Sequence, residues 1–384
     1  MQHGAAATPG TAPEQTTQMH YVHIGMHKAG STTVQKFLSD NVEVLRRHGL
    51  EYPDLGRDRN SHNRLVYSLQ PRTNQAAEIC QRLKEMATES GKKIVISAEG
   101  FEYVNRRQIR NLRDIFGSEP VKIIFHVRKF EELIPSKYTQ RTKTGLNLSN
   151  IDDFVETALQ QSWLQIANTI EKWVTHFTPA SFAVSQLERL EKRDDALVRQ
   201  MWRDIDLSDD DYDGQAIIPD AKSNPSPHWI AVEFVRAINQ ELNRHPIDES
   251  KLADSKRIKT KRIIQGDETA TAFHINGLLP VLQNAATKCD LESRRVGYLR
   301  QSDRSRIREF YNEEIARLNS LIGTDLRPAE ETPSAGRESL PSVDLLSAEE
   351  RGAVWRAIKR APKVVNLPEV VRERIEAAVK GPSA

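Results

Sequence analysis

The sequence predicts an α/β fold of three layers, in which a central parallel sheet is flanked by helices, with a mainly helical C-terminal part added. Three observations support this prediction. The apolar runs MHYVHIGM, KKIVIS and VKIIFHV are short and rich in β-branched residues, as buried parallel strands are. Amphipathic helical patterns separate these runs along the chain. A glycine-containing segment joins the first run to the first helix.

Apolar spacing places these elements along the chain. The first strand is expected to begin near Met19, and a helix is expected over residues 31–47 because Val34, Phe37 and Leu38 recur at helical spacing. The further predicted strands are 92–97, 121–127 and 181–184. The further predicted helices are 75–90, 106–116, 151–160 and 163–177, then 228–243 and 305–322 within a mainly helical region from 187 to 326.

Changes in composition divide the chain into four predicted regions. Residues 1–18 are small and polar and predict a disordered tail, and one domain is expected over residues 19–326. Residues 327–343 are rich in Pro, Ser and Glu and predict a linker. Residues 344–384 predict a helical extension, with amphipathic patterns at 347–360 and 368–379. These helices are expected to pack on the main body or on a partner, self-association included.

Composition excludes several classes of protein. The 55 Lys and Arg residues nearly balance the 53 Asp and Glu residues, and without a long basic stripe we expect no nucleic-acid partner. No run approaches the roughly 20 apolar residues of a membrane span, and the N-terminus does not resemble a secretory signal. Cys80 and Cys289 are too few for a disulfide framework or a cysteine zinc site. The expectation is a soluble, cytoplasmic, globular protein.

The segment that follows the first strand has the features of a phosphate-binding loop. Gly25 and Gly30 let the backbone bend, so that its N–H groups turn inward at the N-terminus of the next helix. Ser31, Thr32 and Thr33 add hydroxyl groups at the start of that helix. The sequence therefore predicts an anion site at residues 25–33.

The lysine of this loop does not stand where a nucleoside triphosphatase has it. The triphosphatase loop requires a lysine directly after the second glycine. Here Lys28 precedes Gly30, and Ser31 occupies the lysine position. No Lys-Ser/Thr pair is therefore placed to manage a magnesium-bound phosphate.

A second anion site is predicted after the strand at 121–127. Arg128 follows this strand at once, and an arginine there can bind phosphate oxygens with its planar fork of donors. Ser136 lies eight residues later in a helical segment and can add a hydroxyl donor. Pro135 is expected to disturb that helix. The alternative for Arg128 is an ion pair with Glu131 or Glu132.

The order Gly-x-x-Lys-x-Gly-Ser-Thr-Thr after a strand resembles the 5′-phosphosulfate loop of sulfotransferases that use 3′-phosphoadenosine 5′-phosphosulfate (PAPS). The strand–Arg–x₇–Ser arrangement is similar to the 3′-phosphate motif of the same family. The resemblance covers about residues 19–326. It favours bacterial and carbohydrate-type members over the cytosolic small-molecule branch, because Val34 and Gln35 follow the threonines and no Arg-Lys-Gly element occurs. Asn224 and Ser226 are like a late Asn-x-Ser element of the former members, or else are ordinary helix caps.

The resemblance implies a P-loop-type fold and a role for each motif residue. Lys28 would neutralise the departing phosphate, and Gly25, His27, Gly30, Ser31, Thr32 and Thr33 would line the donor loop. Arg128 and Ser136 would bind the 3′-phosphate. No metal is required, and the acceptor would be a hydroxyl of a saccharide, a glycolipid precursor or a secondary metabolite.

An acceptor hydroxyl needs a general base. Glu99 comes directly after a predicted central strand, where ligands bind in open α/β sheets, and is the first candidate. His62 is the second, because histidine titrates near neutral pH. The alternatives are a strand-end salt bridge for Glu99 and a polar loop histidine for His62. His27 is expected to bind the anion or the acceptor, whereas His23 and His126 are expected to be core histidines.

Two other functions stay open from the sequence. A P-loop kinase or nucleotide hydrolase is the enzymatic rival, with Glu99 imitating its acidic residue, and a non-catalytic nucleotide-binding scaffold is the other. The acceptor wall is expected within residues 200–325, including Trp229 and Tyr298. Basic residues at 256–262 either meet an anionic acceptor or form a solvated loop, and the loop is favoured.

Overall fold

The computed structural model describes residues 19–70, 73–89, 92–219, 227–245, 247, 258–265, 268–291, 293, 296–331 and 340–381. The described chain forms two compact units. Unit 1 runs to His126 and also contains residues 171–185 and 190–219. Unit 2 contains residues 127–170, 186–189 and the described residues from 227 onward.

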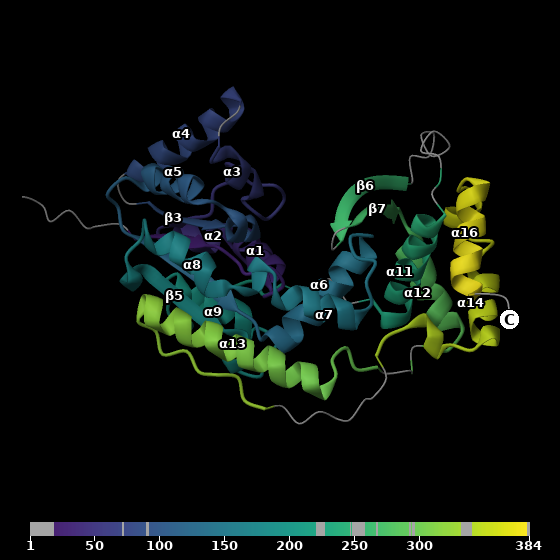
Figure 1. Cartoon of the computed structure of the whole chain (residues 1–384). Coiled ribbons are helices and arrows are strands. Elements are labelled where there is room, and N and C mark those ends of the chain that lie inside the picture. The colour runs from purple at the N-terminus through teal and green to yellow at the C-terminus, as the bar shows by residue number, and fades with distance from the viewer. Residues whose placement is uncertain are drawn as a thin grey trace, which may run out of the picture. The chain divides into compact units, whose positions relative to one another are not determined.

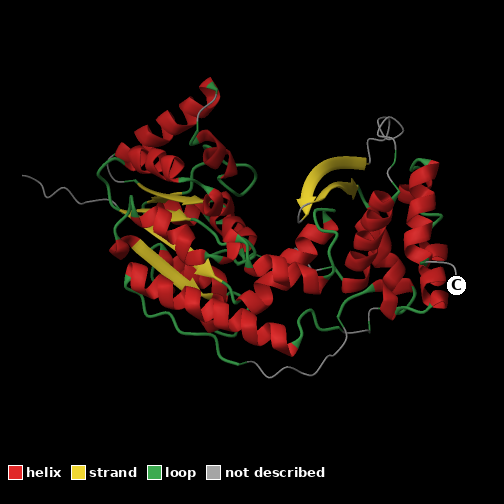
Figure 2. Cartoon of the chain, in the orientation of Figure 1, coloured by secondary structure: helices red, strands yellow, loops and turns green. Residues whose placement is uncertain are grey.

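The central sheet has five strands in the order β2-β3-β1-β4-β5 (Figures 1 and 2). The strands are β1 (His20–His23), β2 (Leu50–Glu51), β3 (Lys93–Ser97), β4 (Val121–Val127) and β5 (Phe182–Gln186). β1 pairs in parallel with both β3 and β4, so that Tyr21 lies opposite Val95 and Lys122. β2 pairs in parallel with β3. The predicted α/β class with a central parallel sheet is confirmed.

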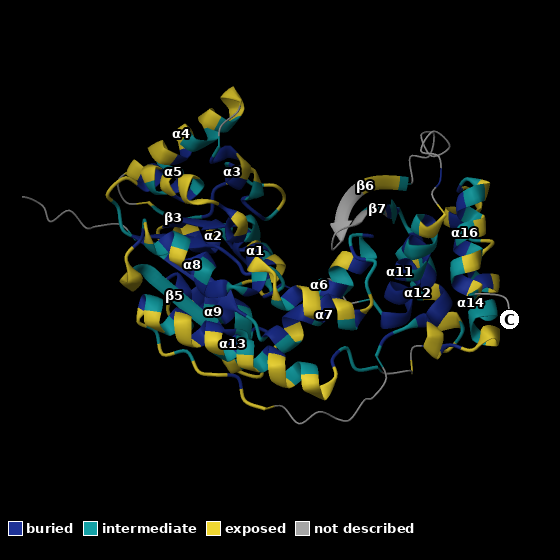
Figure 3. Cartoon of the chain, viewed as in Figure 1, coloured by how far each residue is buried: buried dark blue, intermediate teal, exposed yellow. Residues whose placement is uncertain are grey.

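Helices cover both faces of the sheet. Because strand side chains alternate between the two faces, the strand residues are buried on both sides. Tyr21, Val95 and Ile124 pack with residues of α1 (Ser31–Asp40) and α9 (Ala196–Asp204). On the opposite face, the ring of His20 lies 5.0 Å from that of Phe116. Phe116 ends α5 (Arg106–Phe116), which lies beside α4 (Asn74–Thr88) (Figure 1). The exposed surfaces of α4 and α5 face outward (Figure 3).

The predicted helix over residues 31–47 is two helices, α1 and α2 (Val42–Arg47), separated by Asn41. The Asn41 side chain is fully buried and donates to the carbonyls of Phe37 and Ile217. It also accepts a hydrogen bond from the Ile217 N–H. The break therefore ties α1 to a segment far along the chain, which local spacing could not predict.

Unit 2 is built around helices. Its elements are α6 (Phe130–Lys143), α7 (Ile151–Leu159), α11 (Trp229–Arg244), α12 (Leu278–Lys288), α13 (Gln301–Ile322), α14 (Ala348–Ile358), α15 (Pro362–Val365) and α16 (Glu369–Lys380). Phe234, Leu282, Ile358 and Ile375 belong to one hydrophobic core, which joins α11 and α12 to the C-terminal helices. The apolar faces of the predicted extension are therefore buried within the chain itself. Of the predicted linker, Ala329 is buried and donates its N–H to Asn312, and residues 332–339 lie outside the described part.

The region predicted to be mainly helical also contains an antiparallel hairpin of β6 (Ile258–Gln265) and β7 (Glu268–Ile275). Lys259 and Lys261 are exposed, but they lie on β6, so the predicted loop is wrong for these two residues. Asn239 of α11 accepts a hydrogen bond from the Phe273 N–H of β7. The strand therefore depends on a side chain from a preceding helix. Among the described helices, none is long and apolar enough to cross a membrane.

Candidate functional site

The loop between β1 and α1 continues the pairing of the sheet for a short distance. The Met26 N–H donates to the His126 carbonyl, and the His126 N–H donates to the Gly25 carbonyl. The backbone then turns through Gly25 with φ of 115° and Gly30 with φ of 80°, values that glycine adopts without strain. Gly30 is the N-cap of α1. The local sequence therefore produces the predicted strand–loop–helix junction.

The N-terminus of α1 offers unpaired donors. Within the described part of the chain, the backbone N–H groups of Gly30, Ser31 and Thr32 have no hydrogen-bond acceptor, and Gly30 provides no capping side chain. Thr32 and Thr33 are exposed beside them. Free N–H groups and the positive end of the helix dipole favour a phosphate or sulfate group. The donor set of this loop thus fits the phosphosulfate end of a nucleotide.

Ser31 has a structural part in this loop. Its side chain is buried, and its hydroxyl donates to the Met26 carbonyl at 3.1 Å. This bond closes the loop across its two ends. The side-chain role predicted for Ser31 is therefore internal, and its backbone N–H is the group left for an anion.

Lys28 adopts a left-handed conformation with φ of 67°, which is costly for a residue with a Cβ atom. Its side chain is partly buried. Lys28 lies two residues before the N-cap of α1, as the displaced-lysine motif predicted. A cation at this point adds charge to the free N–H groups of the helix end.

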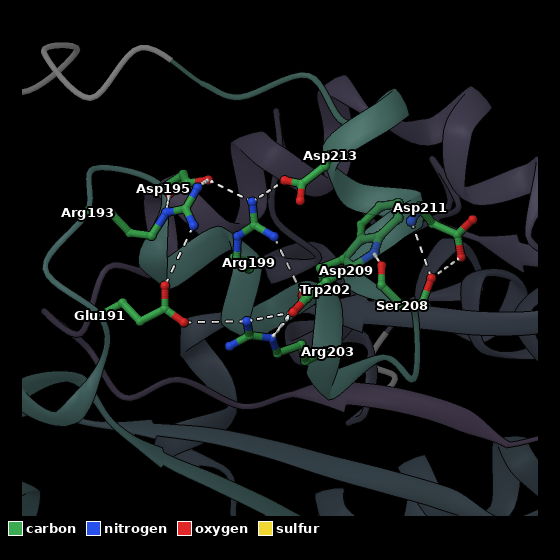
Figure 4. A network of polar contacts seen from close by, with 10 residues as sticks. All are labelled: Glu191, Arg193, Asp195, Arg199, Trp202, Arg203, Ser208, Asp209, Asp211 and Asp213. Atoms are coloured by element: carbon green, nitrogen blue, oxygen red, sulfur yellow. Dashed lines mark hydrogen bonds and ion pairs between the residues drawn. The ribbon is translucent and has the colours of Figure 1, made fainter.

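Helix α9 supports the loop from behind. A Cβ atom on Gly30 would overlap Cδ2 of Leu197, so α9 approaches the loop backbone directly. Figure 4 shows how α9 is anchored: buried Arg199 pairs with Asp195 and Asp213. The buried guanidinium is thus neutralised by carboxylates on both sides. This network fixes the helix that packs against the loop.

A histidine and two glutamates meet beside the loop. The carboxylate of Glu102 accepts a hydrogen bond from the His27 backbone N–H at 2.8 Å and contacts Nδ1 of the ring at 2.7 Å. Nε2 of the same ring lies 3.6 Å from Oε1 of Glu99. The Tyr103 ring packs on the imidazole with centroids 4.9 Å apart. The structure therefore brings the predicted residues His27 and Glu99 together.

Sequence reasoning missed Glu102. Glu99 and Glu102 lie in η1 (Glu99–Tyr103), a short 3₁₀-helix after β3. Residues three apart in a 3₁₀-helix lie on the same side, so both carboxylates face His27. The Glu-Gly-Phe-Glu spacing was the available signal, but it has this meaning only once the turn is known to be 3₁₀.

His62 is withdrawn as a candidate base. Its ring is fully buried, Nε2 contacts the Pro53 carbonyl at 2.9 Å, and Nδ1 accepts the N–H of Ser97 at 3.2 Å. Burial lowers the pKa of His62 to about 4. With both nitrogens bonded to backbone groups, the ring holds the segment before α3 (Asn63–Ser68) against β3 and has no lone pair for a substrate proton.

The expectation that His23 and His126 are core histidines agrees with their contacts. Both are fully buried, with ring centroids 4.9 Å apart. His23 Nδ1 bonds the Ser97 hydroxyl at 2.7 Å, and His126 Nε2 bonds Asp204 at 2.9 Å. Burial holds the pKa of His23 well below its usual value. These rings form part of the sheet beneath the loop.

Arg128 and Ser136 belong to unit 2. Arg128 follows β4 and donates from Nε to Glu132 at 3.1 Å, which is one of the predicted alternatives for it. Its side chain is 30% exposed. α6 runs unbroken through Pro135, and the Ser136 hydroxyl has no hydrogen-bond partner among the described residues. Ser136 is thus free to donate.

Two parts of the predicted acceptor wall are core residues. Trp229 is 5% exposed within the hydrophobic core of unit 2, and Tyr298 packs against the same core. Burial raises the pKa of Tyr298 to about 12. The wall prediction is therefore wrong for Trp229. Asn224, Ser226, Lys256 and Arg257 lie outside the described residues.

A groove of about 1070 Å³ lies elsewhere in unit 1, between α3, α4 and the segment before α3. Arg64 and Tyr67 of α3 line it, and the Tyr67 side chain is 79% exposed. Gln75 and Gln108 add amide groups. α3 also approaches η1, because a Cβ on Gly100 would lie 3.1 Å from Oδ1 of Asn63. The groove is therefore one helix away from Glu99.

Comparison with known proteins adds little to this geometry. No protein-family model matches the sequence, and no curated protein matches it. Among solved structures, a sulfotransferase from Alicyclobacillus acidocaldarius is similar to this chain with a TM-score of 0.40 and 11% sequence identity, over 80% of this chain and 97% of that chain. The loop and its neighbours therefore carry the functional assignment.

Proposed function

We propose that this protein transfers a sulfuryl group from PAPS to an acceptor hydroxyl. The observation that carries the proposal is the end of α1, where the N–H groups of Gly30, Ser31 and Thr32 have no acceptor among the described residues and Lys28 lies two residues before the N-cap. A carboxylate, Glu99 of η1, lies beside this loop, 3.6 Å from Nε2 of His27. An anion cradle beside a proton acceptor is what sulfuryl transfer requires.

Different residues of the loop are proposed to bind different parts of the donor. The N–H groups at the end of α1 and the hydroxyls of Thr32 and Thr33 bind the phosphosulfate oxygens. Lys28 neutralises the negative charge that grows on the phosphate as the sulfur–oxygen bond breaks. PAPS, when bound, supplies the sulfuryl group and a stable bisphosphate leaving group.

Arg128 and Ser136 are proposed to bind the 3′-phosphate. Arg128 follows the strand β4, whose residue His126 exchanges backbone hydrogen bonds with the loop. Its guanidinium donates from Nε to Glu132 and has the planar fork geometry that binds phosphate oxygens. The free hydroxyl of Ser136 adds a second donor.

Glu99 is proposed to take the proton of the acceptor hydroxyl. It lies directly after β3, at the carboxyl edge of the sheet where ligands bind in α/β folds, and its side chain is 35% exposed. The reacting hydroxyl is proposed to lie at Glu99, and the remainder of a large acceptor along the groove at α3. The exposed ring of Tyr67 and the amides of Gln75 and Gln108 suit a hydroxyl-rich molecule such as a saccharide.

Calorimetric titration with adenosine 3′,5′-bisphosphate tests the donor site. We expect metal-independent binding that weakens about 10- to 100-fold in Lys28→Ala and in Arg128→Ala, since each loses a charge-assisted contact. Lys36→Ala is the matched control, because this lysine lies on the same helix and pairs with Asp40. It should bind as the wild type does.

Titration with ATP and magnesium tests the two rival functions. If ATP–magnesium binds and the bisphosphate does not, the protein is a kinase or nucleotide hydrolase and the sulfuryl-transfer proposal is wrong. If both nucleotides fail to bind to the wild type, the loop is not a nucleotide site. Adenosine 5′-monophosphate is the remaining probe: equal affinity for it and for the bisphosphate would rule out a 3′-phosphate site.

A further inference from the structure

Glu102 holds His27 by two hydrogen bonds and has little contact with solvent. Its side chain is 4% exposed, and the same oxygen, Oε2, accepts the His27 N–H at 2.8 Å and contacts Nδ1 at 2.7 Å. Both contacts end on a carboxylate oxygen, which acts as a hydrogen-bond acceptor. Because it can only accept, the proton of the His27 ring is on Nδ1.

The opposite nitrogen of the ring therefore faces the proposed active site with its lone pair. Nε2 lies 3.6 Å from Oε1 of Glu99, too far for a hydrogen bond and close enough for one to form after a small movement. The Tyr103 ring lies beside the imidazole, with centroids 4.9 Å apart and the two planes tilted by 45°. The result is an ordered row of Glu102, His27 and Glu99, in which the last two side chains reach solvent.

We propose that Glu102 is a positioning residue that keeps His27 in the Nδ1–H form, so that Nε2 receives through Glu99 the proton of the acceptor hydroxyl. This inference rests on the proposed sulfuryl transfer and assigns two residues to its proton path. Glu102 does not touch the substrates. His27 acts as the final proton holder, in addition to its place in the donor loop.

The step balances in atoms and charge. The acceptor oxygen forms a bond to sulfur, while the bond between sulfur and the phosphate oxygen breaks and its electron pair leaves with the bisphosphate. The hydroxyl proton passes to a Glu99 oxygen and then to Nε2 of His27. The imidazolium that results lies between two carboxylates, Glu99 and Glu102, which stabilise its positive charge.

A merely structural role for Glu102 would also explain its bond to the His27 backbone. Two variants separate the roles. Glu102→Gln keeps the shape and an acceptor oxygen, but its amide can also donate to Nδ1, so the ring is no longer held in one form. His27→Asn keeps an N–H near the position of Nδ1 and removes Nε2. The loop is expected to fold in both variants.

The first measurement is the protonation pattern of His27 by nitrogen NMR on the full-length chain with labelled histidine, assigned by comparison with His27→Asn. In the neutral ring of the wild type we expect the proton on Nδ1 and none on Nε2. In Glu102→Gln we expect a mixture of both forms. A wild-type ring protonated at Nε2 alone would overturn the proposal, whatever the activity of the protein.

The second measurement uses water as the acceptor. Hydrolysis of PAPS, followed by release of the bisphosphate, needs the same proton path from an attacking oxygen. We expect kcat to fall about 10- to 100-fold in Glu102→Gln and in His27→Asn, with the bisphosphate affinity of Glu102→Gln within about two-fold of the wild type. The control is Arg128→Ala, which should change KM more than kcat.

The outcomes separate this inference from the proposed function. Loss of bisphosphate affinity in Glu102→Gln, in proportion to any loss of rate, would show that Glu102 only braces the loop and would overturn the inference alone. Unchanged hydrolysis in His27→Asn would do the same. Failure of the wild type to bind the bisphosphate would overturn the proposed function, and the NMR pattern would still report on the Glu102–His27 pair.

Discussion

His62 and Ser97 are joined by two hydrogen bonds, one in each direction. The His62 N–H donates to the Ser97 carbonyl at 2.8 Å, and the Ser97 N–H donates to Nδ1 of His62 at 3.2 Å. The other ring nitrogen bonds the Pro53 carbonyl. A proton on Nδ1 would oppose the Ser97 N–H, so this contact holds the ring neutral. His62, a candidate catalytic base from the sequence, is therefore a structural residue bound to the end of β3.

The first prediction concerns the pH dependence of stability. The pKa of His62 is about 4 in the folded protein and 6.5 in its ordinary environment, so the unfolded chain binds the additional proton between these values. Stability therefore falls as pH drops from 6.5 to 4, by about 3 kcal/mol for this one group. Urea unfolding at several pH values checks this. His62→Gln should make the pH dependence shallower by about one proton.

The matched control for that prediction is His245→Gln. The His245 side chain is 52% exposed, so its replacement should leave the pH dependence of unfolding close to that of the wild type. An equal change in the two variants would contradict the assignment of the effect to the buried ring.

The second prediction concerns the approach of α9 to the phosphate loop. Gly30→Ala introduces a Cβ atom that overlaps Leu197 and forces a left-handed alanine, so we expect a loss of about 2–4 kcal/mol in the free energy of unfolding. The double variant Gly30→Ala/Leu197→Ala removes the overlap. Relative to Leu197→Ala alone, the added glycine change should cost only about 1–2 kcal/mol, the backbone strain. Thermal and urea unfolding of the four proteins measure both effects.

The third prediction separates stability from function at Lys28. Its positive φ of 67° is favourable for glycine, so Lys28→Gly should stabilise the fold by about 1 kcal/mol relative to Lys28→Ala. Both variants lack the cation, and both should bind the bisphosphate more weakly than the wild type by about the same factor. Unfolding and calorimetry measure the two quantities independently. A fully restored affinity in the glycine variant would show that conformation rather than charge is what the loop needs.

The fourth prediction concerns the helix that carries Ser136. Tyr138 of α6 donates to Glu233 at 2.5 Å, and Glu233 accepts from Arg236 at 2.8 Å, all of them buried. Tyr138→Phe leaves a buried carboxylate with one fewer donor and should cost about 1–3 kcal/mol in stability. Tyr67→Phe, at an exposed tyrosine, should cost close to nothing. Equal effects in thermal unfolding would contradict the burial argument.

Much of the sheet and of the donor loop could be predicted because it is encoded by neighbouring residues. α5 spans Arg106–Phe116 and β4 spans Val121–Val127, the ranges that helical and strand spacing predicted. The loop motif is a contiguous segment, so its glycines and lysine could be recognised from their order alone. The spacing of apolar side chains and the conformational freedom of glycine are properties of neighbouring residues, so they can be recognised without the rest of the chain.

Other elements could not be predicted because their partners are distant. Asn41 interrupts a helical pattern through bonds to Ile217, which is 176 residues away. The β6–β7 hairpin depends on Asn239 of a preceding helix. The spacing of apolar residues does not reveal such distant partners. It therefore predicts one helix through Asn41 and does not predict the β6–β7 hairpin.

For the residues beside the loop, the sequence predicts their positions and the tertiary structure decides their roles. Local order is sufficient to place His27, Lys28 and Gly30 at one strand–helix junction, and Glu99 at the end of a strand. The tertiary fold decides what each does, because β1 and β3 are neighbours in the sheet and bring residues 75 positions apart into hydrogen-bond range. That pairing turns Glu102 toward His27. Burial against Pro53 and Ser97 removes His62 from the reaction by satisfying both of its nitrogens with backbone groups.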